Sequence, residues 1–188
     1  MDYGINRERA LELLHQHLSQ PNLIKHSLAT EAVMGKLAQR CQADATLWTL
    51  AGLLHDLDVE LTLDDLSRHT HETARILRRE GVAEEIVEAI CLHNEAAHEQ
   101  QRSKPLHHAL AAGETITGLI IATALVYPDK KLASVKPKSV QKRYKEKLFA
   151  AGANRDIIAE CELIGIPLAE FCDLCLAAMQ DIAADLDL

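Results

Sequence analysis

Apolar residues recur at helical spacing along most of the chain, and no stretch keeps the apolar–polar alternation that a half-buried β-strand needs. Residues 22–41 illustrate the pattern, because Leu23, Val33 and Leu37 fall near one helical period. This spacing predicts an all-α fold, built as a compact bundle of several helices.

Residues that start and stop helices divide the chain further. Asn6 and Asp44 are typical N-caps, Gly81 is a typical C-terminal cap, and Pro105 suits a first helical turn. The predicted helices cover about residues 7–19, 22–41, 45–55, 70–80, 82–93, 105–126, 137–151, 154–164 and 167–186. Polar loops are expected at 57–69 and 94–104. Because no convincing linker interrupts this order, the chain is predicted to form one domain over residues 1–188.

Composition limits the classes of partner. The formal net charge is −8 and the pI is about 5.7, which argues against general affinity for nucleic acid or for an anionic membrane surface. The N-terminus lacks a basic-then-apolar signal pattern, and the apolar run at 116–126 is shorter than the ~20 residues of a membrane helix. We therefore expect a cytoplasmic protein with no membrane partner. A homo-oligomer stays open, because the helix at 167–186 is apolar enough to bury against a copy of itself.

The five cysteines form an odd set, which in a chain without a secretion signal indicates reduced thiols. Cys172 and Cys175 are spaced so that both lie on one apolar helix face. That position favours packing in the core over a metal or redox site.

The stretch LAGLLHDLD, residues 50–58, ends an apolar helix in His55, Asp56 and Asp58. Three further helices each carry one group of a similar kind, namely His26, His93 and Glu114. Taken singly, each residue has a structural explanation, such as a helix cap, a hydrogen-bonded pair or an ion pair with a lysine. Four helices that each supply a histidine or a carboxylate instead favour a site for a divalent ion such as Mn, Fe, Zn, Ni or Co.

The same residues resemble the signature of the HD-domain metal-dependent phosphohydrolase superfamily, a single His, an adjacent His-Asp pair and a distant acidic residue. The matching segments are IKHSLAT, AGLLHDLD and ALAAGETITG, and the resemblance is closest to the HDIG branch over roughly residues 22–126. It implies that this region is the core of the fold, with the helices of 127–188 packed on it. It also implies one metal held by His26, His55, Asp56 and Glu114. HTHETARIL and HNE resemble the family's second-metal segments, which implies His69 and His93 as further ligands.

Four positions depart from the family pattern. Glu114 stands for the distal Asp, Asn94 for the second of two paired histidines, Asp58 for the glycine of HDIG, and Thr73 for the glycine of the segment that begins at His69. The longer Glu114 side chain keeps the chemistry but changes the spacing. Because Asn94 removes one potential ligand, the number of ions stays open between one and two.

The resemblance implies that the metal, one or two ions of Mn, Fe, Zn, Ni, Co or Mg, activates a water for attack on phosphorus. With two ions, Asp56 would bridge them. With one ion, a side chain has to assist, and Asp58 or His71 is the expected base.

A phosphate substrate also needs cations. Residues 128–147 hold eight of the twenty Lys and Arg residues of the chain, directly after the helix of Glu114. Lys130 and Lys131 lie nearest that helix and are predicted to bind substrate phosphate. The alternative is that these lysines form a solvated helix face.

The sequence thus predicts a phosphohydrolase that cleaves a phosphomonoester or phosphodiester, with a small nucleotide-type substrate favoured over nucleic acid. The alternatives are a catalytically weak HD-fold module that senses or binds a ligand, and a purely helical interaction protein.

Overall fold

The computed structural model describes residues 2–188, which form helices and connecting turns with no strand in that range. The α-helices are α1 (Arg7–His17), α2 (Pro21–Cys41), α3 (Ala45–Leu54), α4 (Val59–Thr62), α5 (His71–Arg79), α6 (Glu84–His93), α7 (Pro105–Leu125), α8 (Pro137–Lys145), α9 (Arg155–Ala159) and α10 (Leu168–Asp181). Short 3₁₀ helices follow at η1 (Glu95–Ala97), η2 (Leu132–Ser134) and η3 (Glu160–Ile164). The all-α prediction is confirmed.

The predicted caps act where the sequence put them. The Asn6 side chain accepts a hydrogen bond from the backbone N–H of Arg9, and the Asp44 side chain accepts one from Leu47. Gly81 follows α5 with a φ of 79°, a left-handed conformation that glycine adopts without steric cost. Each cap satisfies a backbone group that the end of a helix leaves unpaired.

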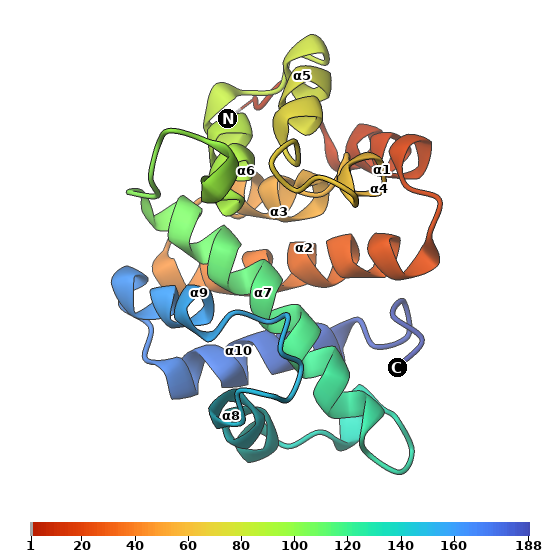
Figure 1. The fold of residues 1–188 in the computed structure, drawn as a ribbon, viewed down its shortest axis with the longest axis vertical. Helices are drawn as coiled ribbons and strands as arrows, with labels where there is room; N and C mark the ends of the chain where they lie inside the picture. Colours follow the sequence, from red (N-terminus) through yellow and green to blue (C-terminus); the bar gives the residue numbers. More distant parts are fainter. Residues whose placement is uncertain (1) are drawn as a thin grey trace.

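Helices α2 and α7 run through the middle of the molecule and cross each other (Figure 1). Helices α3, α5 and α6 lie on one side of α2, and the C-terminal helices α8, α9 and α10 lie on the other (Figure 1). The aliphatic core continues through all of these layers. The C-terminal helices therefore cover faces of α2 and α7 that would otherwise be exposed.

Two glycines allow the central helices to approach closely. A Cβ at Gly52 of α3 would lie 2.9 Å from the backbone oxygen of Thr30 on α2, and one at Gly113 of α7 would lie 3.3 Å from the side chains of Val33 and Met34. Any larger residue at Gly52 would push α3 away from α2. This contact matters for the site, because α3 ends immediately before His55.

The apolar run at 116–126 is part of helix α7, which has 21 residues. By length and composition alone it could cross a membrane, with a mean hydropathy of 1.4 over its best window. However, 61% of that window is buried inside the protein, where α7 packs against α2, α6 and the C-terminal helices. The apolar surface of α7 is thus accounted for by the core.

The helix boundaries differ from the predictions mainly in the C-terminal third. Helix α8 ends at Lys145 instead of continuing to about 151, because Arg155 binds the carbonyl oxygens that a longer helix would use. Helix α10 ends at Asp181, and the predicted loop at 57–69 contains the short helix α4.

Cys172 and Cys175 are free thiols buried in the core. Burial raises the pKa of Cys172 to about 12 and raises that of Cys175 well above its ordinary value. Both observations agree with the packing role predicted for the pair, because a thiol of high pKa is a weak nucleophile and a weak metal ligand at neutral pH.

Candidate metal centre

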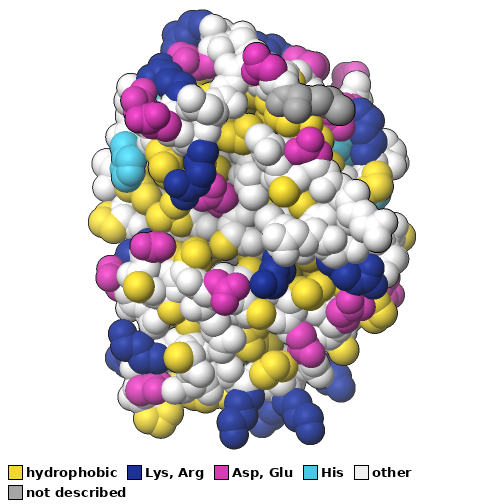
Figure 2. Space-filling view, turned by 180° about the vertical axis from the view of Figure 1, so that it is seen from behind, with side chains coloured by type: hydrophobic (Ala, Val, Ile, Leu, Met, Phe, Trp, Pro, Cys, Tyr) yellow, Lys and Arg dark blue, Asp and Glu magenta, His cyan; other side chains and the backbone are white. Residues whose placement is uncertain are grey.

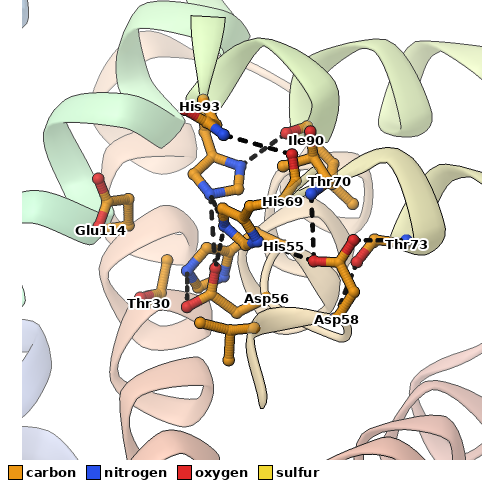
Figure 3. Close-up of polar contacts among 12 residues, drawn as sticks. Thr30, His55, Asp56, Asp58, His69, Thr70, Thr73, Ile90, His93 and Glu114 are labelled. Carbon is orange, nitrogen blue, oxygen red and sulfur yellow. Dashed lines mark hydrogen bonds and ion pairs between the residues drawn. The ribbon is translucent and has the colours of Figure 1, made fainter. Parts of the chain in front are cut away.

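Four histidines from different parts of the chain meet at one point. His26 comes from α2. His55 follows α3, His69 precedes α5, and His93 ends α6 (Figure 3). The Nε2 atoms of His26 and His55 lie 3.1 Å apart, and those of His69 and His93 also lie 3.1 Å apart. These are hydrogen-bond distances between atoms that cannot all be donors.

The opposite ring nitrogen of each histidine contacts a fixed oxygen. His55 Nδ1 lies 2.8 Å from the Gly52 carbonyl, and His93 Nδ1 lies 2.6 Å from the Ile90 carbonyl. A carbonyl oxygen only accepts, so Nδ1 of each ring carries the proton and Nε2 presents a lone pair. Burial lowers the pKa of His55 to about 3, which keeps this ring neutral. Histidines held in this way are typical metal ligands.

Thr117 orients the ring of His26. Its hydroxyl donates to the Glu114 carbonyl at 2.7 Å and lies 3.0 Å from His26 Nδ1. The hydroxyl proton is thus used, so the oxygen accepts the N–H of His26. The Nε2 atom of His26 is left with a lone pair that points at the cluster. No motif in the sequence had singled out Thr117.

Asp56 divides the cluster into two halves. Its Oδ2 lies 3.4 Å from His55 Nε2 and 3.6 Å from His26 Nε2. Its Oδ1 lies 3.2 Å from His69 Nε2 and 3.4 Å from His93 Nε2. One carboxylate oxygen thus faces each histidine pair. This is the arrangement by which a carboxylate can bridge two metal ions.

The half of the cluster that contains His26, His55 and Asp56 Oδ2 is called the first half below. Glu114 lies at its edge (Figure 3). Its Oε2 is 3.9 Å from His26 Nε2, and its Oε1 accepts a hydrogen bond from the Thr115 hydroxyl. His26, His55 and Glu114 form one group with the spacing of a metal site, and His55, Asp56 and His93 form another. Burial raises the pKa of Glu114, as expected for a carboxyl group that lacks a cation.

The charges in the cluster favour a bound cation. Burial by itself would raise the pKa of Asp56, but the imidazoles of His55, His69 and His93 lower it well below the ordinary value. Burial would likewise lower the pKa of His69, but hydrogen bonds to Asp56 and Asp58 raise it to about 9. The carboxylates therefore need positive charge beside them, which an imidazolium at His69 or a divalent ion can supply.

Asp58 holds His69 and does not face the centre of the cluster. Its Oδ1 is 2.7 Å from His69 Nδ1 and accepts the backbone N–H of Thr70, and its Oδ2 accepts that of Thr73 (Figure 3). The side chain is fully buried. This position does not support the predicted role of Asp58 as a base, because both carboxylate oxygens already accept hydrogen bonds.

Asn94 also has a structural role. Its side-chain amino group donates to the carbonyl oxygens of Leu66 and His69 at 2.8 and 3.3 Å. It thereby fixes the loop that carries His69. The departure from a paired histidine removes a ligand but adds a support for another one.

His71 is not part of the cluster. Its ring stacks on that of His98 with centroids 4.5 Å apart, and its Nε2 lies 3.1 Å from the Ala97 carbonyl. It lines a separate cavity of about 830 Å³ with Arg78 and Cys91. The prediction of His71 as a base is therefore not supported by its position.

Lys130 and Lys131 are also far from the cluster. They are exposed in the loop after α7, whose end lies roughly 16 Å along the helix axis from Glu114. Several Lys and Arg side chains lie at the end of the molecule where α8 lies, and others lie at the opposite end (Figure 2). Neither lysine lines a cavity that contains a cluster residue. Lys130 and Lys131 follow the helix of Glu114 in the sequence, but the fold places them away from Glu114.

Three cavities border the cluster. One of about 240 Å³ is lined by Asp56, Leu66, His69, His93, Asn94 and Glu114, one of about 480 Å³ reaches His26 and Glu114, and one of about 500 Å³ reaches His93. The cluster residues are thus reachable from solvent while most of each ring is buried. A site of this kind can hold a metal and still admit a substrate.

Comparison with known proteins assigns the segment that carries the cluster to a known domain family. The family model of the HD domain matches residues 23–125, which contain every residue of the cluster. Ribonuclease Y of Thermus thermophilus is 31% identical over 91 residues, 48% of this chain and 15% of that protein. Ribonuclease Y of Deinococcus radiodurans is 29% identical over 103 residues, 55% of this chain and 16% of that protein. The matched segment is thus about 15% of the length of these relatives. Because the family model covers more than half of the sequence, the chain belongs to the HD domain family.

Proposed function

We propose that this protein is a metal-dependent phosphohydrolase that cleaves a phosphomonoester or phosphodiester of nucleotide type in the cytoplasm. One observation carries the proposal. Four histidine Nε2 atoms converge on the two oxygens of Asp56, one histidine pair on each oxygen. This donor set suits one or two divalent ions of the series Mn, Fe, Zn, Ni and Co.

The bound metal would supply a water of lowered pKa and neutralise charge on the phosphate. The residues of the chain fix its position. His26, His55 and Asp56 Oδ2 would hold one ion with Glu114 beside them, and His69, His93 and Asp56 Oδ1 would hold the second. Asp58 and His71, the two bases predicted for a one-ion site, do not face the cluster, which supports the two-ion form.

The similarity to proteins named ribonuclease Y supports a phosphate ester as the substrate, since a ribonuclease cleaves phosphodiester bonds. The matched segment is a small part of those proteins, so their substrate stays a candidate for this chain. RNA ends and short oligonucleotides belong in the substrate panel together with mononucleotides.

The experiment measures metal and hydrolysis on the same samples. The purified protein is analysed for bound metals by mass spectrometry, then assayed on p-nitrophenyl phosphate, its bis ester and a nucleotide panel. His55→Ala and Asp56→Ala should lose the metal and the activity together, while His15→Ala, an exposed histidine in α1, should keep both.

Two outcomes count against the proposal. Full metal occupancy in both cluster variants would contradict the ligand assignment. Metal in the wild type with no hydrolysis of any phosphate ester would favour the alternative, an HD-fold module that binds or senses a ligand.

A further inference from the structure

The cavity that reaches His26 and Glu114 is lined mostly by small, uncharged residues. It measures about 480 Å³, which is within the roughly 300–1,000 Å³ range of small-molecule sites. Beyond His26 and Glu114 it is lined by Thr115, Gly118, Ala150, Gly152, Ala153, Asn154 and Ile157. Mostly small, uncharged residues thus line an open cavity that reaches the proposed metal ligands.

One wall is the face of α7 that carries Glu114. Gly118 follows Glu114 by one helical turn, so both residues lie on the same face. A Cβ added at Gly118 would meet no atom within 4 Å. Glycine lowers the stability of a helix interior by roughly 1 kcal/mol relative to alanine. Here it is not required by a neighbouring helix, and its effect is to widen the cavity beside the cluster.

The opposite wall is the turn at 146–153, and Arg155 holds it in place. The guanidinium donates to six backbone carbonyls, and four of these belong to residues of the turn, namely Glu146, Phe149, Ala150 and Ala153. Ala150 has a φ of 46°, a left-handed conformation that alanine adopts only when its surroundings impose it. The cavity is therefore bounded by backbone that is fixed before a ligand arrives.

The charge of the cavity limits what it can bind. None of the described residues that line it is a lysine or arginine, and Glu114 is acidic. Arg102, which lines the adjoining cavity together with Asn154 and Ile157, makes two hydrogen bonds of 2.8 and 2.7 Å to Glu160. A second or third phosphate group would find no partner here and would face a carboxylate.

Asn154 provides one polar contact at the outer end. Its Oδ1 accepts the backbone N–H of Asp156 at 2.9 Å. Its amino group has no hydrogen-bond partner within residues 2–188, so it can donate to a ligand. Ile157 and Ala153 offer apolar surface beside it.

From these contacts we propose that the cavity between Gly118 and the turn at 146–153 binds the uncharged nucleoside part of the substrate. The phosphate then lies at the metal cluster, and the preferred substrate is a nucleoside ester with a single phosphate group. This inference rests on the proposed function for the position of the phosphate.

The test fills the cavity from either wall. Gly118→Leu adds a side chain on α7, and Gly152→Leu adds one on the turn, where a Cβ also meets no atom within 4 Å. Gly118→Ala is the control, because one methyl group leaves most of the space open. Circular dichroism and metal content verify that each variant folds and keeps the cluster.

Two probes separate the cavity from the cluster. The four ribonucleosides, which lack phosphate, are titrated into metal-loaded protein by calorimetry and tested as inhibitors of p-nitrophenyl phosphate hydrolysis. Inorganic phosphate is tested in parallel. We expect at least one nucleoside to bind the wild type and to bind both leucine variants about tenfold more weakly, a change of roughly 1.4 kcal/mol. Phosphate inhibition and metal content should stay unchanged.

The inference fails if no nucleoside binds the wild type, or if both leucine variants bind it as well as the wild type does. It also fails if a nucleoside triphosphate is turned over in preference to the monophosphate. Because calorimetry needs no turnover, these results are distinct from failure of the proposed function, which shows as absence of metal or of hydrolysis.

Discussion

Asp58 and Thr73 hydrogen-bond each other twice. The backbone N–H of Asp58 donates to the Thr73 hydroxyl at 3.0 Å, and the backbone N–H of Thr73 donates to Asp58 Oδ2 at 3.0 Å. Both residues stand where the family pattern has glycine. The two departures therefore form one structural unit, which joins the chain after the His55-Asp56 pair to the first turn of α5 and positions His69.

Because Asp58 positions His69, we expect a substitution of Asp58 to lower metal affinity although Asp58 is not itself a proposed metal ligand. Asp58→Asn keeps the size of the side chain but removes the charge that His69 Nδ1 contacts at 2.7 Å. Changes of this kind lower metal affinity by about 10- to 100-fold. Competition with a fluorescent chelator measures the affinity, and Asp64→Asn in the exposed part of the same loop is the control. Equal affinity of the Asp58 variant and the wild type would show that Asp58 does not support a metal ligand.

Thr117→Val should weaken the first half of the cluster. The variant keeps the shape of the side chain but removes the hydroxyl that accepts the N–H of His26. The expected result is again a decrease of about 10- to 100-fold in metal affinity. Thr123→Val, also buried on α7 and bonded only to the Leu119 carbonyl, is the matched control. Equal effects of the two changes would assign the result to α7 stability and not to His26.

The two halves of the cluster predict separable ions. His93→Ala removes a ligand from the half that faces Asp56 Oδ1, and His26→Ala removes one from the half that faces Oδ2. Each single variant should retain at most one ion, whereas the wild type should bind two. Mass spectrometry of the intact metal-loaded protein counts them. A wild type that binds a single ion under saturating metal would restrict the site to one half.

Arg155→Lys should destabilise the protein. A lysine cannot reproduce the planar set of donors that satisfies six carbonyls, so several partly buried acceptors lose their partners. We expect a loss of at least about 2 kcal/mol in the free energy of unfolding, measured by urea denaturation. The exposed Arg79→Lys serves as control. A difference below about 0.5 kcal/mol between the two would mean that the turn at 146–153 holds its conformation without Arg155.

Glu160 predicts an acid-dependent contribution to stability. Burial would raise its pKa, but Arg102 and His108, which contact its oxygens at 2.7–2.8 Å, lower it below 4.5. The folded-state pKa lies below the unfolded value, so the carboxylate contributes stability above pH 4.5 and loses it as the pH falls further. The stability difference between wild type and Glu160→Gln should therefore shrink below pH 4.5. Urea denaturation from pH 7 to 3, with exposed Glu99→Gln as control, tests this.

The helices and five residues of the cluster could be predicted because they depend on patterns within short stretches of the sequence. Helical spacing marks which faces are buried, and caps such as Asn6, Asp44 and Gly81 act within a few residues of themselves. His26, His55, Asp56, His69 and His93 could be named because they sit in recognisable segments, and the structure brings their side chains together.

What only the tertiary structure decided is where side chains of similar chemistry point. Asp58 and His71 are next to ligands in sequence, yet one is consumed by buried hydrogen bonds and the other faces a different cavity. Lys130 and Lys131 follow the helix of Glu114, but the length of α7 carries them away from the cluster. Thr117 and Arg155 gain their importance from partners that folding supplies. Distance along the chain is a poor measure of distance in a helical bundle, because a helix turns its side chains through all directions and moves its ends far apart.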